Sequence, residues 1–274
     1  MQDRVAPSPT MWAMARVVER PALEWVLAFC AEDPVERVFL EDVARRGLGR
    51  FVGIADRGRL SALCHVGANV VPSGHGVAAL ARAAARGEPR MMVGEEGAVS
   101  ELWEAIRRRM PEPLEDRPGQ PVFVLDSPPA RSGTGLRTAT LEDLDLLVPA
   151  CAAAYFEEVG VDAYARDPGL FRWRTRSQIE LGRSWLWVED DEICFKAEAS
   201  ACTPSAVQLQ QVWVEPERRG QGYAKRALSD LCALLLGQTP VVCLFARREN
   251  AAALALYDSI GMRQTIRYRS LIFS

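Results

Sequence analysis

The segment with the clearest chemical potential joins a strand-like run to a helix-like run. It reads Val212-Trp-Val-Glu-Pro-Glu-Arg-Arg-Gly-Gln-Gly-Tyr-Ala224. The first-turn amides of a helix have no internal partners and the helix dipole favours negative charge, so such a junction can bind an anion. Gly220 and Gly222 let a phosphate approach the backbone, and Arg218 or Arg219 can add charge. The segment predicts a phosphate-binding loop; the alternative is a glycine turn before an amphipathic helix.

A second motif follows the next strand-like run, Val241–Phe245. It reads Asn250-x-x-Ala253-x-x-Leu256-Tyr257-x-x-x-Gly261-Met262. Together with Arg219-x-x-Gly222-x-Ala224, this motif resembles the GCN5-related N-acetyltransferases, the GNAT family. The family's phosphate loop reads Arg-x-x-Gly-x-Gly/Ala, and its late helix commonly reads Asn-x-x-Ala-x-x-Leu-Tyr-x-x-x-Gly-Phe. The resemblance covers roughly residues 136–274.

The resemblance implies transfer of an acetyl group to an amine by direct attack, with acetyl-CoA as co-substrate and without a metal. Amides of the loop at 219–224 would hold the pyrophosphate of coenzyme A. The edge of the strand at 212–214 would bond the pantetheine arm, and an amide near its end would polarise the acetyl carbonyl. The cofactor-binding residues implied in this way are Val212, Trp213, Val214, Arg219, Gly220, Gln221, Gly222, Tyr223, Ala224 and Asn250.

The resemblance makes Tyr257 the general acid that protonates the departing thiolate. A phenol is a usable proton donor, with a pKa of about 10. Ala253, Tyr257 and Ile260 share one face of the expected helix, so the alternative is that the ring only packs in the core. Asn250 would cap the same helix or touch the pantetheine.

The base that deprotonates the amine is less evident. The strand-like run Val207–Val214 offers glutamines and no carboxylate. In the preceding run, Lys196, Glu198 and Ser200 share one face by alternation, and this strand borders the amine site that the resemblance implies. Glu198 is therefore the predicted base, and a satisfied Lys–Glu surface pair is the alternative.

Two more carboxylates, Glu157 and Glu158, end the first helix expected in the second half of the chain. Proteins of this fold often receive their substrate at that place. The resemblance therefore implies that both residues bind substrate, because acids there would attract a cationic amine. A solvated helix end is the alternative.

Composition bounds the class of protein. The chain has 274 residues and a formal net charge of −3, which argues against nucleic acid as the main partner. Its seven cysteines are scattered without a Cys-x-x-Cys pair, which favours a reducing cytoplasm over a disulfide framework or a zinc site. No apolar run approaches the ~18 residues of a membrane helix, and the polar N-terminus leads into no signal-peptide core, so no membrane association is expected. The oligomeric state stays open.

A proline-rich stretch divides the chain. Six prolines lie between positions 111 and 129, and a boundary there gives domains of residues 1–130 and 131–274. The strand-like run Pro121–Leu125 is expected to close the first domain. In the second domain, hydrophobic patterns predict strands at 136–140, 184–188, 193–201, 207–214 and 241–245, and helices at 141–156, 170–181, 223–236 and 250–260.

The first domain repeats the same order of elements more faintly, which indicates a diverged duplication; chance recurrence of α/β order is the alternative. Its counterpart of the phosphate loop reads Val71-Pro-Ser-Gly-His-Gly76 and lacks the motif. The whole chain also resembles an actinobacterial two-part group within the GNAT family, in segments such as Val38-Phe-Leu-Glu-Asp42 and Glu157-Glu-Val-Gly-Val161. In that group a glycine usually precedes Val-Trp-Val, where this chain has Gln211.

We therefore predict an α/β protein with mixed sheets, built of tandem GNAT-like domains of which the N-terminal one is degenerate. The C-terminal domain is expected to be an acetyl-CoA-dependent N-acetyltransferase whose amine acceptor is a small molecule or a peptide. The alternative is a non-catalytic acyl-CoA-binding sensor or interaction protein on a GNAT scaffold.

Overall fold

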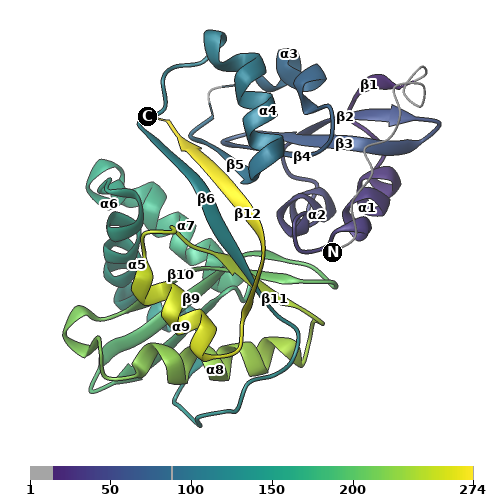
Figure 1. The fold of residues 1–274 in the computed structure, drawn as a ribbon. Coiled ribbons are helices and arrows are strands. Elements are labelled where there is room, and N and C mark those ends of the chain that lie inside the picture. Colours follow the sequence, from purple (N-terminus) through teal and green to yellow (C-terminus); the bar gives the residue numbers. More distant parts are fainter. Residues whose placement is uncertain (1–14, 88, 274) are drawn as a thin grey trace. The chain divides into compact units, whose positions relative to one another are not determined.

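The structure is a computed structural model that describes residues 15–87 and 89–273 (Figure 1). By its internal contacts the chain divides into two units. Unit 1 holds the residues up to Gln120 and those from Ile266 onward, and unit 2 holds Pro121–Thr265. Both units combine helices with strands of mixed direction, so the predicted α/β class with mixed sheets is confirmed. The domain boundary near residue 130, which the sequence predicts, is a different division of the chain from these contact-based units, and it stays a prediction.

Unit 1 carries its strands in the order β1-β2-β3-β4-β5, and the C-terminal part of β12 pairs antiparallel with β5. Its buried apolar residues form two clusters, one of which packs α4 and the turn after β4 onto the strands. The elements are β1 (Arg16–Glu19), α1 (Leu23–Glu32), α2 (Val38–Arg45), β2 (Arg50–Asp56), β3 (Arg59–Val66), β4 (Asn69–Gly74), η2 (Val77–Leu80), α3 (Ala81–Ala84), β5 (Met91–Glu95), α4 (Glu96–Ile106) and η3 (Arg107–Arg109).

Unit 2 carries its strands in the order β7-β8-β9-β10-β11, followed by the C-terminal part of β6. Most expected elements are present, with bounds that shift by a few residues. They are β6 (Glu115–Leu125), β7 (Arg137–Thr138), η4 (Leu141–Asp143), α5 (Leu144–Val159), α6 (Ala163–Arg166), α7 (Pro168–Glu180), β8 (Ser184–Glu189), β9 (Glu192–Cys202), β10 (Val207–Val214), η5 (Pro216–Arg218), α8 (Tyr223–Leu236), β11 (Val242–Phe245), α9 (Ala251–Ser259) and β12 (Arg263–Ile272).

The two faces of the unit 2 sheet are covered by different helices. Successive residues of β8 point to opposite faces, as the pleat of a strand requires. Trp185 and Trp187 pack in the cluster that includes α8, whereas Leu186 packs in the cluster built on α5 and α7. Among the described residues, no helix is both long and apolar enough to cross a bilayer.

The run Pro121–Leu125 forms a strand, but the expectation that it closes the first half is wrong. It pairs antiparallel with β11 of unit 2, from Leu125 opposite Val242 to Val122 opposite Phe245. Unit 1 is completed instead by the C-terminal residues of β12, which pair with β5. Alternation of apolar residues predicts that a segment is a strand but does not determine which edge it joins.

The same local topology occurs in both units. In each unit two strands form an antiparallel pair, and the next strand of the sheet lies parallel to the second of them but pairs with it at two residues only. In unit 1 β4 pairs with β5 at positions 69 and 70, and in unit 2 β10 pairs with β11 at positions 207 and 208. Beyond those pairs the two strands part, which leaves one edge of the longer strand without a strand partner.

The start of α5 is fixed by a side-chain network that sequence patterning partly predicts. Thr140 and Asp143 form a reciprocal capping box at η4, the 3-10 turn that leads into α5. Arg137 donates to both carboxylate oxygens of Asp143, at 2.6 and 2.7 Å. These bonds, with those from Thr140, lower the pKa of Asp143 to about 2.

We expect Asp143→Asn to lower the free energy of unfolding at pH 7 by about 1–2 kcal/mol. The folded-state pKa of Asp143 lies below its ordinary value of 3.8. The stabilisation is therefore complete above pH ~4 and disappears as the pH falls toward 2. Urea unfolding of both proteins between pH 7 and pH 2 checks this, because their stabilities should converge only as the pH approaches 2. Equal stability at pH 7 would contradict the assignment.

Candidate functional site

The candidate site lies along β10, where this strand has parted from β11. The two strands pair only at Val207 with Val242 and at Gln208 with Cys243. From Leu209 to Val214 no described strand pairs with β10 on the side of β11, while β9 continues on its other side. Backbone amides and carbonyls on such an edge can bond an extended ligand as a strand would. Val212, Trp213 and Val214, which the sequence predicts as cofactor-binding residues, belong to this edge.

A β-bulge interrupts β10 at its middle. Gln210 faces Glu198 and Trp213 faces Lys196, so two residues of β10 lie opposite one residue of β9. Gln211, the first of the two, has a φ of +48°. This left-handed conformation favours glycine, and a bulge of this kind commonly has glycine there. The departure noted in the sequence at Gln211 therefore coincides with a real irregularity of the strand.

The loop after β10 has the geometry of an anion site. Gly220 and Gly222 have φ values of +74° and +81°, which explains why glycine stands at both positions. A Cβ on either residue would meet no described atom within 4 Å, so the loop faces open space. The first amide after them that bonds back along the chain is that of Arg226, to the carbonyl of Gly222. In the described structure the amides from 220 to 225 thus have no backbone acceptor and can receive a phosphate.

The two loop arginines differ in their partners. Arg218 is tied to the turn between β8 and β9, because its guanidinium bonds Glu189 at 3.1 Å and lies 3.3 Å from the hydroxyl of Tyr223. Arg219 donates from Nε to the carbonyl of Val214 at 3.0 Å, which joins the loop to the end of β10. Its other guanidinium nitrogen bonds both carboxylate oxygens of Glu157, at 2.7 and 2.9 Å.

Both predicted substrate residues make contacts within the chain, Glu157 through its carboxylate and Glu158 through its backbone carbonyl. Glu157 accepts from Arg219 and also from the indole nitrogen of Trp213, at 3.2 Å. The backbone carbonyl of Glu158 accepts from Arg247, which follows β11. The end of α5 is therefore held beside the edge of β10 and beside the loop that follows it. This is the place where the sequence predicts that an amine substrate would bind. Binding of substrate by either carboxylate stays a prediction.

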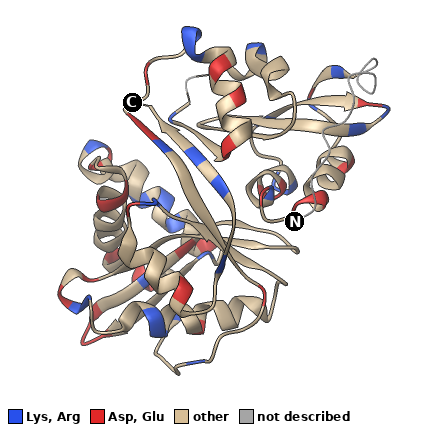
Figure 2. Cartoon of the chain, viewed as in Figure 1, with Lys and Arg blue, Asp and Glu red and all other residues tan. Residues whose placement is uncertain are grey.

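Sequence reasoning missed one cation of this site. Arg226, in the first turns of α8, stacks on the rings of Tyr223 and Trp187 at 4.8 and 4.9 Å. Figure 2 shows the basic stretch at this end of α8. Lys225 and Arg226 pair with no carboxylate among the described side chains, unlike Arg218. The sequence could have indicated this role, because Lys225 and Arg226 stand three and four residues after Gly222, in the first turn of a helix whose N-terminal amides favour an anion.

We expect Arg226→Ala to weaken coenzyme A binding about fivefold, because an exposed cation near a phosphate contributes about 1 kcal/mol. The loss should shrink as salt is raised. Titration calorimetry with coenzyme A at low and high salt measures both effects. Arg174→Ala is the matched control, since Arg174 is also exposed and stacks on a tyrosine but lies on α7. Equal effects of the two changes would contradict the placement.

Tyr257 lies on α9 with its ring in the core, 5.2 Å from that of Phe123. Only 7% of the residue is exposed, and its hydroxyl has no hydrogen-bond partner among the described residues. Burial, reinforced by the nearby Glu158, raises the pKa of this phenol. Tyr257 therefore stays protonated at neutral pH, as a general acid must before it acts. Asn250 caps the same helix by accepting from the amide of Ala253 at 3.1 Å.

Glu198 lies in a buried ion pair. Its Oε1 is 2.9 Å from Nζ of Lys196, and the two residues are 4% and 0% exposed. Burial alone would raise the pKa of Glu198, but the charge and hydrogen bond of Lys196, together with Arg174 and Cys151, outweigh it and lower that pKa. Burial would likewise lower the pKa of Lys196, and Glu198 raises it instead. The Lys–Glu pair considered as the alternative is thus present, in the interior and not at the surface, and the role of Glu198 as base stays a prediction.

In unit 1 the counterpart of the loop is closed by the chain itself. The turn at Gly76 leads into the 3-10 helix η2. The amides of Gly76 and Ala78 donate to the carboxylate of Glu101, at 3.3 and 3.1 Å, so they are not free to bind a phosphate. A carboxylate is the natural stand-in for a phosphate at a helix start. The anion position of unit 1 is therefore filled by an internal side chain.

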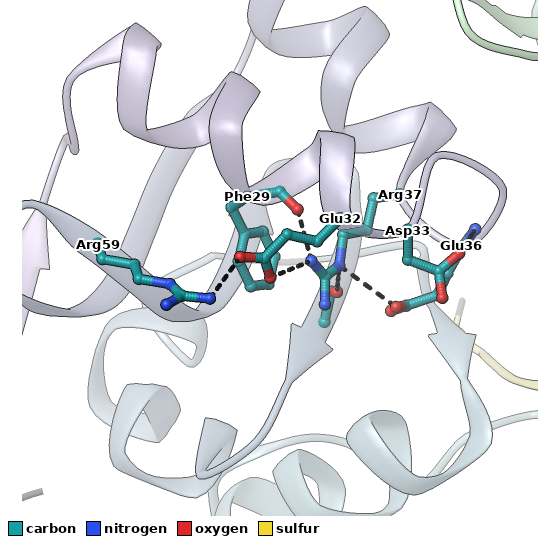
Figure 3. A network of polar contacts seen from close by, with 7 residues as sticks. Phe29, Glu32, Asp33, Glu36, Arg37 and Arg59 are labelled. Atoms are coloured by element: carbon teal, nitrogen blue, oxygen red, sulfur yellow. Dashed lines mark hydrogen bonds and ion pairs between the residues drawn. The ribbon is translucent and has the colours of Figure 1, made fainter. Parts of the chain in front are cut away.

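Polar contacts also crowd the part of unit 1 where β4 parts from β5, beyond Val70 (Figure 3). Arg37, from the segment between α1 and α2, donates from Nε to the hydroxyl of Ser73 at 3.0 Å. Its guanidinium lies 3.6 Å over the ring of Phe29 and 3.3 Å from the carboxylate of Glu36. This part of unit 1 is taken up by the chain's own side chains, in contrast with the unpartnered amides after β10.

Comparisons with known proteins agree with this division. The model of the acetyltransferase (GNAT) family matches residues 150–262, and a domain of unknown function, DUF4081, matches residues 49–147. No curated protein matches the chain.

Solved structures match over both units. A GCN5-related N-acetyltransferase from Sphaerobacter thermophilus is 18% identical, with a TM-score of 0.57, and the match covers 93% of this chain and 94% of that one. A GNAT-family acetyltransferase from Colwellia psychrerythraea is 13% identical, with a TM-score of 0.57, over 94% and 100% of the two chains. A tandem GNAT protein from the clavulanic acid biosynthesis pathway is 13% identical, with a TM-score of 0.53, over 94% and 98%.

At these identities the structural likeness establishes the fold, and the family model adds the assignment of the C-terminal part. The tandem arrangement expected from the sequence is therefore confirmed at the level of the fold. Residues 150–262 thus match the acetyltransferase (GNAT) family and residues 49–147 match DUF4081, and the chain has the fold of solved tandem GNAT proteins.

Proposed function

We propose that unit 2 transfers an acetyl group from acetyl-CoA to an amine by direct attack. The observation that carries the proposal is the unpaired edge of β10, which leads directly into a loop of unpartnered amides at 220–225. An extended pantetheine arm matches the first feature and a pyrophosphate matches the second. The GNAT family model spans both features.

The amides of the loop would hold the pyrophosphate, with positive charge from Arg219, Lys225 and Arg226. The edge from Val212 to Val214 would bond the pantetheine. An amide at the end of this edge would polarise the acetyl carbonyl and stabilise the oxyanion of the tetrahedral intermediate, an effect of about 3–4 kcal/mol for a well-placed donor. The amine attacks the carbonyl carbon, the C–S bond breaks, and coenzyme A leaves as thiolate.

Tyr257 would protonate that thiolate. Two observations support this role: the hydroxyl has no hydrogen-bond partner among the described residues, and burial raises its pKa so that the proton is retained at neutral pH. Glu157 and Glu158 would lie on the acceptor side and favour a cationic amine. Glu198 is the proposed base, acting on the amine directly or through water.

We expect Glu198→Gln to lower turnover about tenfold and to remove the acidic limb of the rate-versus-pH profile. The loss should be moderate, because water that reaches the amine can also accept its proton. The pKa of Glu198 is lowered, so the limb lies below the ordinary range of a glutamate. Steady-state rates measured from pH 3 to 9 test the role, because the limb lies at the acidic end of this range. An unchanged profile would remove Glu198 from the mechanism.

The proposal is tested by an acetyl-CoA turnover screen against panels of small amines, amino acids, aminoglycosides and peptides. Release of coenzyme A that depends on one class of amine supports an N-acetyltransferase and identifies its acceptor. Slow hydrolysis with no accepted amine would favour the alternative, an acyl-CoA-binding sensor on this scaffold. A cytoplasmic location and membership of the actinobacterial two-part group stay predictions from the sequence.

A further inference from the structure

A buried ammonium group lies next to the bulge of β10. Nζ of Lys196 is 2.9 Å from the carboxylate of Glu198, 3.2 Å from Sγ of Cys151 and 3.0 Å from Oε1 of Gln211. Lys196 is 0% exposed, and its ammonium has three donors, one for each of these contacts. Two of these contacts hold the ammonium inside unit 2: Glu198 lies on β9 and Cys151 lies on α5. The third contact reaches out to β10.

The residue at the end of this contact is held in a strained conformation. Gln211 has a φ of +48°, and the other four described non-glycine residues with positive φ, Arg20, Arg57, Asp190 and Asp191, all lie in turns. Gln211 is thus the one described case inside a strand. Such a conformation persists only where the surroundings impose it. The hydrogen bond from Lys196 is the contact that holds the Gln211 side chain.

The residues that follow Gln211 are those whose direction matters most. A slip of one residue in a strand turns every later side chain and amide to the other side. If Gln211 relaxed to ordinary β geometry, the bulge would close, and the amides at 212–214 that now face the open edge would turn toward β9. Trp213 would also lose its place beside Glu157.

We propose that Lys196 is a positioning residue for the acyl-CoA site. Its buried ammonium, fixed by Glu198 and Cys151, holds Gln211 in the left-handed conformation and thereby keeps the bulge of β10 and the direction of the strand edge at 212–214. Lys196 thus acts on the cofactor site through backbone geometry, with no contact of its own to the reacting atoms. This role rests on the proposed function of that edge, and it is separate from the role of Glu198 as base.

The test uses glycine at position 211, where it adopts positive φ without help. Lys196→Met alone would leave a buried, unpaired carboxylate and could unfold the protein. The charges are therefore removed together in K196M/E198Q, with E198Q as the reference that cancels any contribution of the base. The affinity for coenzyme A is measured by calorimetry, because a role in proton transfer does not change it.

We expect K196M/E198Q to bind coenzyme A about tenfold more weakly than E198Q, the equivalent of one strained residue. Adding Q211G should restore the affinity to within about threefold. Q210G is the matched control, because Gln210 is the preceding residue of β10 and has no positive φ; it should restore nothing. Loss of affinity without rescue by Q211G, or equal rescue by both glycines, would overturn the proposal.

A second readout separates this proposal from the proposed function. In thermal unfolding without ligand, Q211G should raise the midpoint of K196M/E198Q by about 2–4 °C more than it raises that of the wild type. If the wild-type chain binds no coenzyme A, the proposed function fails, and this difference alone decides whether Lys196 holds Gln211. A difference of zero would refute the coupling even if the enzyme is active.

Discussion

Replacing Tyr257 with phenylalanine should lower the turnover of acetyl-CoA by about 10²-fold or more, while the affinity for acetyl-CoA stays the same. The ring and its packing against Phe123 are kept, and only the hydroxyl is lost. Because that hydroxyl has no partner among the described residues, its removal breaks no internal bond. The melting temperature should therefore change little, and the loss should lie in kcat. Steady-state kinetics and thermal unfolding measure the two quantities.

Tyr268→Phe is the matched control for this prediction. Tyr268 is also buried, but it lies in unit 1 and its hydroxyl donates to the backbone carbonyl of Glu36 at 2.8 Å. Loss of that bond should lower stability by about 1 kcal/mol and leave turnover unchanged. Unchanged turnover in Tyr257→Phe would show that the tyrosine only packs in the core.

Replacing Gly222 with valine should weaken coenzyme A binding by at least about 30-fold, the equivalent of about 2 kcal/mol. Gly222 has a φ of +81° directly before the first turn of α8. A β-branched residue is strained in this conformation, so the loop would have to change its path and turn its amides away. The added side chain would also stand in the open space that a phosphate needs. Calorimetric titration with coenzyme A measures the loss.

Gly182→Val separates this loss from general strain. Gly182 has a φ of +66° after the end of α7, and a Cβ there also meets open space. Both valines should therefore lower the melting temperature by similar amounts, but only the one at position 222 should affect coenzyme A. If the two variants bind coenzyme A equally well, the loop at 219–224 is not the phosphate site.

The elements of unit 2 could be predicted because their signals are local. The apolar spacing of α8, the capping box at Thr140 and the glycines of the loop each act within a few residues. The partner of Pro121–Leu125 could not be predicted in this way. The alternation of its apolar residues is compatible with a place in either unit. Its pairing with β11 joins segments that are far apart in the sequence, and no local pattern determines such a pairing.

The candidate site was predictable in its backbone features and less so in its side-chain contacts. The glycines of the loop at 219–224 and their place directly before a helix are both visible in the sequence, so the amides at the start of that helix could be predicted to face an anion. The burial of Lys196 and Glu198 could not be predicted from the sequence. The alternation of side chains along a strand places both residues on one face of the sheet, but it does not show whether helices cover that face. Glu157 likewise bonds Arg219 across sixty-two positions, which no local pattern announces.

In unit 1 the counterpart of the anion-binding loop is occupied by the chain's own side chains, although strands like those of unit 2 surround it. Glu101 bonds the two amides that would receive an anion, and the contacts of Arg37 fill the neighbouring part of the sheet. Both features use charges that the chain supplies to itself. We therefore expect one molecule of coenzyme A to bind per chain, in unit 2.

The central claim is transfer of the acetyl group and not its mere binding. The most direct measurement is to supply acetyl-CoA with an isotopically labelled acetyl group and the best amine of the screen, and to count both products. The account predicts one labelled amide for each coenzyme A released, and a common loss of both in Tyr257→Phe. Coenzyme A that binds but is released without labelled amide, at a rate independent of the amine and of Tyr257, would contradict it.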